Sequence, residues 1–363
     1  MKITTIGIDL AKAVFQIHGV DERGKVAVRR QLKRAEMSSY FANLETCLIG
    51  MEACGSAHHW ARKLEGYGHK VKLMAPQFVK PYVKTNKNDM ADAPKAGNSL
   101  SSGELEKLTP EAICEAVSRP NMRFVAMKTV EQQAILSVHR ARQGFVKART
   151  AQGNQIRGLL SEFGIVIPQG IRQIIKQIPE ILEDGENGLP GTMRNLIERL
   201  TENLKEMDRQ AKELETQIQL WHRENEASRK LAEIPGLGPI TASAIVATVG
   251  DAREFKNGRQ LAAWMGLVPR QHSSGGKQNL LGISKRGDTY LRTLMIHGAR
   301  AVIRFAENKA EPESWLRKLM SRRNKNVAAV ALANKNARIV WALLAHDRMF
   351  RPDYTPAAVV AGM

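Results

Sequence analysis

The sequence predicts an α/β N-terminal domain, a coiled-coil arm and a mostly α-helical C-terminal domain. Short apolar runs alternate with helix-like segments up to residue 92, which is typical of a mixed sheet with helices on its faces. Apolar side chains then follow a seven-residue repeat over residues 193–221, and residues 228–350 are mostly helical in pattern. With 363 residues, of which 43% are hydrophobic, the chain is long enough for two or three domains with buried cores.

Basic residues exceed acidic residues by a wide margin. The chain has 55 Lys and Arg against 36 Asp and Glu, a formal net charge of +19. Because Lys and Arg release counterions from phosphates, this excess favours a nucleic-acid partner. The alternative is a basic protein that is merely soluble. The N-terminus lacks an apolar signal-peptide region and no apolar run reaches bilayer length, so we expect a cytoplasmic protein with no membrane partner.

The three cysteines form neither a metal-binding nor a disulfide pattern. Cys47, Cys54 and Cys114 are odd in number and lack C-x-x-C spacing. We therefore expect buried, reduced thiols rather than a zinc site or a disulfide framework.

The order of the apolar segments defines the N-terminal domain. Residues 14–20 alternate between apolar and polar side chains and should pair with the first apolar strand, and a turn at residues 21–24 leads to a third strand. The expected strands are 3–9, 14–20, 26–32, 47–52 and 71–74, and the expected helices are 35–44 and 58–66.

Four acidic residues mark this domain. Asp9 and Glu52 end two of the apolar runs, and Asp89 and Asp92 form a D-x-x-D pair whose spacing places both on one side of a helix. Carboxylate oxygens suit Mg²⁺, and two such ions can stabilise the attacking and leaving oxygens of a phosphate. Each acid alone would be a solvated or capping residue. The four together, in a basic protein, predict a Mg²⁺ site for chemistry on nucleic-acid phosphates.

Residues 94–110 interrupt the α/β pattern. Pro94 and the Gly and Ser content end any helix that begins at Asp89, so we expect an inserted surface loop. The Thr-Pro-Glu sequence at residues 109–111 is then typical of the N-cap and first turn of a new helix.

A long basic helix is predicted at residues 129–163. The sequence has no acidic residue between Arg140 and Arg157. A solvated face is the ordinary explanation, but a stripe of one sign repels itself, which favours contact with RNA or DNA phosphates. The basic residues expected to make this contact are Arg140, Arg142, Lys147, Arg149 and Arg157.

The apolar positions between Met193 and Trp221 are separated by steps that alternate between four and three residues. This heptad predicts a coiled-coil arm over residues 166–227, which would serve for self-association or as a rigid spacer. The alternative is an ordinary amphipathic helix packed on its own domain.

Residues 231–245 match a helix-hairpin-helix. Gly236 and Gly238 permit a tight turn, and backbone N–H groups at the start of the following helix can bind a DNA phosphate. A plain corner between two helices would need the same glycines without a phosphate.

A loop rich in Gly and Ser is expected at residues 270–288, and it contains Ser274 directly before Gly275. A serine in such a loop is ordinarily a turn residue, so a nucleophilic role depends on the acidic quartet. The basic residues that could stabilise the charge of a phosphoryl transition state there are Arg270, Lys277, Lys285 and Arg286.

Taken in order, these motifs resemble those of a known family. The segments IGID, MEACG, NKNDxxDA, IPGLG and GLVPRxxxSGG, spread over residues 6–344, are similar to those of the DEDD transposases of the one-ten type insertion sequences, the bridge-RNA-guided recombinases. The resemblance implies a RuvC-like, RNase H-fold domain at 1–165, the coiled-coil arm at 166–227, a serine-bearing transposase domain at 228–350 and a tail at 351–363.

The resemblance also implies chemistry and partners. It makes the four acids the Mg²⁺ ligands, and it makes Ser274 the residue that attacks DNA and becomes a covalent phosphoserine. Ser274 is preferred to Ser273 because the family's serine directly precedes glycine. The implied partners are a structured guide RNA and donor and target DNA, bound by a dimer of dimers whose active-site parts come from different subunits. Such a protein would act at the nucleoid in the cytoplasm of a prokaryotic cell.

The sequence departs from the family at one point. In the family the helix that carries D-x-x-D continues directly, whereas here residues 94–110 intervene and could displace that helix and reduce activity. We expect an RNA-guided DNA recombinase and transposase. The alternatives are a RuvC-type hydrolytic junction nuclease, in which water is the nucleophile, and a non-catalytic RNA- or DNA-binding protein.

Overall fold

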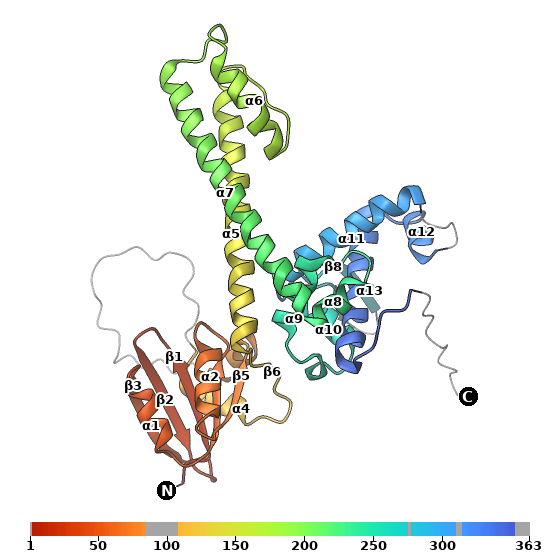
Figure 1. The fold of residues 1–363 in the computed structure, drawn as a ribbon. Coiled ribbons are helices and arrows are strands. Elements are labelled where there is room, and N and C mark those ends of the chain that lie inside the picture. Colours follow the sequence, from red (N-terminus) through yellow and green to blue (C-terminus); the bar gives the residue numbers. More distant parts are fainter. Residues whose placement is uncertain (1, 84–107, 275–276, 310–313, 353–363) are drawn as a thin grey trace. The chain divides into compact units, whose positions relative to one another are not determined.

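A computed structural model of the chain describes residues 2–83, 108–274, 277–309 and 314–352 (Figure 1). The chain divides into two compact units, Met1–Val130 and Glu131–Met363. The basic helix expected at residues 129–163 therefore belongs to the second unit, together with the arm and the C-terminal helices, rather than to the N-terminal domain.

The N-terminal unit is built on a six-stranded sheet with the strand order β3-β2-β1-β4-β5-β6. β1, β4 and β5 are parallel to one another, whereas β2, β3 and β6 are antiparallel to their neighbours. The strands are β1 Thr5–Leu10, β2 Val14–Val20, β3 Val26–Lys33, β4 Leu48–Glu52, β5 Lys70–Met74 and β6 Phe124–Val125. The helices are α1 Met37–Ala42, α2 Ala57–Glu65, α3 Pro76–Val79 and α4 Pro110–Val117, with the 3-10 turn η1 Lys80–Tyr82.

All five strands and both helices that the sequence predicted before residue 75 are present. Successive side chains along a strand point to opposite faces of the sheet, and on β1 and β4 both faces are covered. Ile8 and Met51 are fully buried on the face that α1 and α2 cover. The opposite face carries α4.

The helix α4 lies against the sheet at two glycines. Gly7 on β1 and Gly50 on β4 are neighbours in the parallel register. A Cβ on Gly7 would lie 2.1 Å from the carbonyl oxygen of Pro110, and one on Gly50 would lie 2.7 Å from Cβ of Val117. Because no side chain tolerates such contacts, glycine is required at both positions for α4 to lie this close.

The segment before α4 contains the predicted insertion. Residues 84–107 lie outside the described residues, and with them lie Asp89, Asp92 and most of the segment 94–110. The helix after it begins as predicted, because the hydroxyl oxygen of Thr109 accepts a hydrogen bond from a backbone N–H in the first turn of α4.

The second unit begins with a helical arm formed by α5 (Val130–Ser161), α6 (Ile171–Glu183) and α7 (Gly191–Glu224) (Figure 1). α5 and α7 lie side by side and run in opposite directions. Four heptad positions of α7, seven residues apart, are buried within the single chain: Ile197, Leu204, Ala211 and Ile218. Because this side of the repeat packs on α5, α6 and α9, the packing favours an intradomain helix over a self-association arm as the cause of the heptad.

The rest of the second unit is mostly helical. Its elements are α8 Glu226–Ala232, α9 Pro239–Val249, η2 Ala252–Glu254, α10 Gly258–Trp264, β7 Pro269–Ser274, β8 Lys277–Ile283, α11 Thr289–Lys309, α12 Trp315–Met320 and α13 Lys325–His346. The loop predicted at residues 270–288 is wrong in part, since β7 and β8 form an antiparallel hairpin there. Leu280 and Leu281 are both exposed, so the hairpin lacks the alternating burial by which a strand is recognised in a sequence.

The core of this part is centred on α13, which packs against α10 and α11. Within the described ranges, α13 is the single helix whose length and apolar composition would suffice to cross a bilayer, a stretch that the sequence reading did not single out. Its residues Leu332, Val340 and Leu343 are buried in the protein core, as in the central helix of a globular domain.

Candidate functional site

Two of the four predicted acids lie side by side on the sheet. In the parallel register Ile8 is opposite Met51, so Asp9 and Glu52 follow at the same end of the neighbouring strands β1 and β4. Ile8 and Met51 point to the face of α1 and α2. The alternation of side chains therefore places both carboxylates on the opposite face, which also bears Gly7 and α4.

The local electrostatics reflect this proximity. Burial raises the pKa of Glu52 above its usual value, and the negative charge of Asp9 raises it further. Cys54, two residues after Glu52, has its pKa raised to about 11, first by burial and then by the charges of Glu52 and Asp9. Negative charge is thus concentrated where the neighbouring strands β1 and β4 end, and the thiol of Cys54 beside it is protonated at neutral pH.

The donor set fits a hard divalent cation. The charges of the two carboxylates repel one another, so a bound Mg²⁺ would stabilise both of them. No group of three or more His, Cys, Asp or Glu side chains suited to a metal occurs in the part of the chain that the structure describes. Asp89 and Asp92, the other half of the predicted quartet, lie outside that part, so the quartet stays a prediction with Asp9 and Glu52 as its described half.

The predicted nucleophile lies at the tip of the β7–β8 hairpin in the second unit. Ser274 ends β7, and its backbone pairs with that of Lys277 at the start of β8. Gly275 and Gly276 come between them in the sequence and lie outside the described residues.

The base of this hairpin is fixed to the helical core by two glycines with positive φ. A Cβ on Gly266 (φ +73°) would lie 2.1 Å from the carbonyl oxygen of Arg286, and one on Gly287 (φ +103°) would lie 1.8 Å from that of Trp264. The buried Arg292 donates from its guanidinium to the carbonyl oxygen of Met265 at 3.3 Å. Close backbone packing therefore sets where the hairpin emerges from the core.

Three basic residues predicted to act near the serine surround the base of the hairpin. Arg270, Lys285 and Arg286 are all exposed. Lys285 adopts a positive φ of 54° and its backbone N–H donates to the carbonyl oxygen of Gly266 at 3.3 Å. Their contact with phosphate stays a prediction.

The glycine turn between α8 and α9 is also closely packed. Gly236 has φ +92°, and its carbonyl oxygen would lie 1.8 Å from a Cβ on Gly298 of α11, so neither position has room for a side chain. Gly238 precedes α9 as its N-cap, and a Cβ there would meet open space. Close packing alone accounts for the glycine at position 236. Gly238 remains accessible at the start of α9, where the sequence predicts a bound phosphate.

The basic helix α5 is partly neutralised by α7. Arg142 donates to Glu215 at 3.0 Å, and Arg149 donates to Asp208. Arg157 donates to the backbone oxygen of Pro168 and to the side chain of Asn154. The acid-free stripe of the sequence therefore does not persist in three dimensions, because α7 supplies acids to it.

Two of the five predicted residues remain available for phosphate. Arg140 and Lys147 are exposed, and no described carboxylate forms an ion pair with either. They are seven residues apart on α5 and so lie on one side of the helix. Contact with nucleic acid stays a prediction for both.

A buried cluster of polar side chains, which the sequence did not predict, joins the arm to the C-terminal helices. His139 of α5 lies 3.1 Å from the hydroxyl of Ser243 on α9 and 3.0 Å from that of Tyr290 on α11. Ser243 donates to the carbonyl oxygen of Pro239 at 2.6 Å, so its oxygen accepts from Nε2 of His139, and Nδ1 accepts from Tyr290. A lone histidine in a helical pattern gives no signal of such partners.

Known proteins resemble the chain over nearly its full length. It is 52% identical to a "Probable family 20 transposase" of Pseudomonas aeruginosa over 97% of this chain and 100% of that protein. The chain belongs to the IS116/IS110/IS902 family of transposases. It is also 45% identical to the transposase for insertion sequence element IS1111A of Coxiella burnetii, over 96% of this chain and 92% of that protein. The chain is 39% identical to the transposase for insertion sequence element IS1328 of Yersinia enterocolitica, over 96% of this chain and 98% of that protein.

The model of this transposase family, described as Transposase IS116/IS110/IS902 family, matches residues 228–313. This range contains the glycine turn with Gly236 and Gly238 and the β7–β8 hairpin, whose first strand ends at Ser274. The acid pair lies outside it, in a part of the chain that the full-length relatives share. Family membership, expected from the order of the motifs, is therefore confirmed.

Proposed function

We propose that this protein is a DNA transposase that cleaves and rejoins DNA through a covalent phosphoserine at Ser274, directed by a structured guide RNA. Mg²⁺ would be held by Asp9, Glu52, Asp89 and Asp92. The observation that carries the proposal is the placement of Asp9 and Glu52 on one face, at the same end of two neighbouring parallel strands, in a member of a transposase family.

The N-terminal unit would be a RuvC-like domain with the RNase H fold. In support, its sheet has an antiparallel three-stranded edge followed by parallel strands, and the acid pair lies where the two parts meet, at β1 and β4. Acids at the ends of adjacent central strands are suited to binding metal ions that contact phosphate oxygens.

The chemistry would proceed by transfer of one phosphodiester bond to serine and back. The hydroxyl oxygen of Ser274 attacks phosphorus and loses its proton, an O–P bond forms, and the bond from phosphorus to the leaving deoxyribose oxygen breaks, with that oxygen taking a proton. A hydroxyl oxygen of the second DNA strand then attacks the phosphorus of the phosphoserine and loses its proton. The bond from phosphorus to Oγ of Ser274 breaks, that oxygen takes a proton, and the DNA backbone is rejoined. Bond energy is conserved in the adduct, so no nucleotide cofactor is consumed.

The residues of this chain have separate tasks in that scheme. The four acids would hold Mg²⁺, which would neutralise charge on the phosphate oxygens. Arg270, Lys277, Lys285 and Arg286 would stabilise charge around the serine hairpin. Arg140, Lys147 and the turn at Gly238 would hold RNA or DNA backbone, in an assembly of two dimers with donor and target DNA.

A denaturing-gel test for a protein–DNA adduct decides between this proposal and its alternatives. The protein, the RNA transcribed from the flanks of its gene, Mg²⁺ and labelled donor DNA would be combined. Wild type should give an adduct that is absent in Ser274→Ala and retained in the matched control Ser273→Ala. Asp9→Asn should abolish the adduct and leave RNA binding intact.

The other outcomes identify other functions. Cleaved ends without an adduct would identify a hydrolytic junction nuclease, with water as nucleophile. RNA binding without cleavage in a variant from which residues 94–107 are deleted, which keeps the Thr109 N-cap and the first turn of α4, would identify a non-catalytic binding protein, because the insertion could then no longer be the cause of inactivity.

A further inference from the structure

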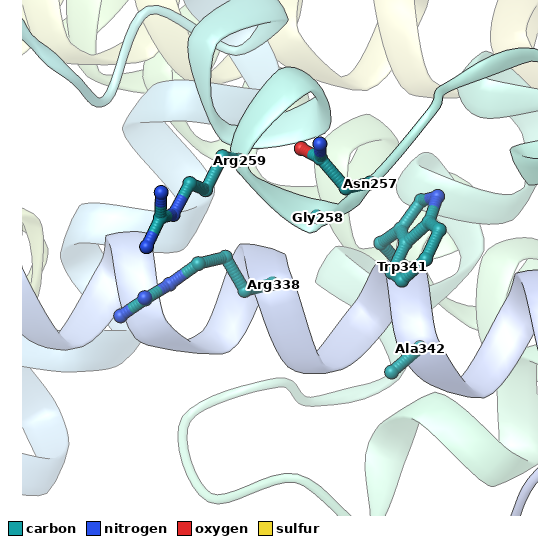
Figure 2. A pocket seen from close by; sticks show the side chains of 6 residues that line it. All are labelled: Asn257, Gly258, Arg259, Arg338, Trp341 and Ala342. Atoms are coloured by element: carbon teal, nitrogen blue, oxygen red, sulfur yellow. The ribbon is translucent and has the colours of Figure 1, made fainter. Parts of the chain in front are cut away.

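An open pocket lies between α10 and α13 in the C-terminal part of the second unit (Figure 2). Its volume is about 400 Å³, and it is lined by Asn257, Gly258, Arg259, Arg338, Trp341 and Ala342. None of these residues belongs to the acid pair, the serine hairpin, the glycine turn or the basic helix α5.

Two arginines without acidic partners meet at this pocket. Figure 2 shows the side chains of Arg259 on α10 and Arg338 on α13 extending toward the same side of the pocket that both residues line. Both residues are exposed, and across the described ranges no carboxylate forms an ion pair with either. Adjacent like charges repel one another, so an anion bound by both groups would remove the repulsion.

Close packing fixes the backbone segments from which the two arginines extend. Gly258 is buried directly before Arg259, and a Cβ there would lie 2.9 Å from Cα of Arg338. Trp341, almost one turn further along α13, donates from Nε1 to the carbonyl oxygen of Phe255 at 2.9 Å. The segment that leads into α10 is therefore fixed to α13 at two points, Phe255 and Gly258, directly before Arg259.

A nearby arginine shows the contrasting arrangement. Arg253 donates to both carboxylate oxygens of Asp251, at distances of 2.8 to 3.1 Å. Its charge is already paired within the protein, whereas the charges of Arg259 and Arg338 are not.

We propose that Arg259 and Arg338 form a binding site for a phosphodiester group of a nucleic-acid backbone. Guanidinium groups donate pairs of hydrogen bonds that match phosphate oxygens, and they stay charged at all physiological pH values. The formal net charge of +19 favours a polyanion over an isolated small anion. The inference rests on the proposed function only in taking nucleic acid as the ligand, and it assigns no part in catalysis to this site.

The test measures how the dissociation constant depends on salt. A short labelled DNA duplex and a labelled RNA hairpin would be titrated with wild type and with Arg259→Gln/Arg338→Gln over a range of salt concentrations. Each phosphate contact contributes about 0.9 to the slope of log K against log salt for duplex DNA. The double variant should bind about tenfold more weakly at moderate salt and lose about 1 from the slope, and the probe that shows the loss identifies the backbone as DNA or RNA.

Matched variants make the result specific. Arg253→Gln removes one charge from the same region but should leave the slope unchanged, because Asp251 already neutralises that arginine. Arg259→Lys/Arg338→Lys keeps the charge and should retain most of the slope. Since neither arginine makes a hydrogen bond with a described residue, the thermal unfolding midpoint of the double variant should equal that of wild type.

Two outcomes would overturn the site: an unchanged slope on both probes, or an equal loss in Arg253→Gln. The test also separates this inference from the proposed function. The titrations are run without Mg²⁺ and require no cleavage, so a protein that never cleaves DNA can still show the loss caused by Arg259→Gln/Arg338→Gln.

Discussion

The imidazole of His139 on α5 lies 3.1 Å from the hydroxyl of Ser243 on α9. Tyr290 of α11 contacts the other ring nitrogen at 3.0 Å, so one buried side chain connects the arm to two helices of the C-terminal part. Burial lowers the pKa of His139 to about 4, and the charge of Arg142 contributes to the decrease. The ring is therefore neutral at physiological pH and serves as both donor and acceptor.

This neutral histidine should make the protein less stable as the pH falls. In the unfolded chain its pKa is about 6.5, so between pH 6.5 and about 4 the unfolded state binds a proton that the folded state does not. The stability lost over this window is about 3 kcal/mol. His139→Gln keeps a donor and an acceptor without the titration, and its unfolding midpoint should depend less on pH in this window. Equal pH dependence in both proteins would contradict the assignment.

The sequence could not predict this cluster, for a physical reason. Ser243 and Tyr290 follow His139 by 104 and 151 residues in the sequence, and each of the three lies in an ordinary helical pattern. Local sequence patterns indicate whether a segment is buried, but they do not indicate which distant polar group forms the hydrogen bond that a buried polar side chain needs. The same limit applies to Arg142 and Arg149, whose partners Glu215 and Asp208 are 73 and 59 residues away.

The N-terminal sheet was predictable because its strands carry their own signal. The run Ile6-Gly7-Ile8 and the alternation of residues 14–20 follow directly from burial on one or both faces. The sequence also placed Asp9 and Glu52 at the same end of two strands, which the structure shows to be neighbouring and parallel. The hairpin at Ser274 was not predicted, because exposed strands such as β8 lack a buried face to impose alternation.

The glycine pair beneath α4 should be intolerant of side chains. Gly7→Ala would place Cβ 2.1 Å from the carbonyl oxygen of Pro110, so α4 must move away from β1, and we expect a loss of about 3 kcal/mol or more in unfolding free energy. Denaturant unfolding of the Gly7→Ala variant and of wild type measures this loss in unfolding free energy. Gly55→Ala is the matched control, since a Cβ there meets nothing within 4 Å. A loss no larger than that of the control would show that α4 does not pack as described.

Mg²⁺ should stabilise the N-terminal unit through the acid pair. Burial and Asp9 raise the pKa of Glu52, so stability from this group is present below its unfolded pKa and lost as pH rises through the raised value. At neutral pH a bound cation offsets that loss, and the unfolding midpoint should rise with Mg²⁺ concentration.

Two single variants test whether the Mg²⁺-dependent rise of the unfolding midpoint depends on Asp9 and Glu52. Glu52→Gln should raise the midpoint without Mg²⁺, because it removes a partly buried charge next to that of Asp9, and should abolish the response to Mg²⁺. Glu65→Gln, which changes an exposed acid at the end of α2, should respond as wild type does. If Glu52→Gln kept the full response to Mg²⁺, the acid pair would not be the binding site.

The basic helix α5 should separate into residues that bind phosphate and residues that hold the arm together. Arg140→Gln/Lys147→Gln removes two exposed charges, so it should weaken nucleic-acid binding and reduce the salt slope by about 2 if each residue contacts one phosphate. Its unfolding midpoint should stay at the wild-type value. The pair Arg142→Gln/Arg149→Gln removes side chains that are bonded to Glu215 and Asp208 across the helices. Asp208 is only 16% exposed, and without Arg149 its poorly solvated carboxylate keeps Lys212 as its described ion-pair partner.

This second variant should therefore be destabilised, by about 1 to 3 kcal/mol, with a smaller change in the salt slope than the first. Salt-dependent anisotropy and denaturant unfolding, measured on both variants, give the two quantities independently. The reverse pattern, in which the paired arginines carry the slope and the exposed residues carry the stability, would mean that nucleic acid displaces α7 carboxylates when it binds the arm.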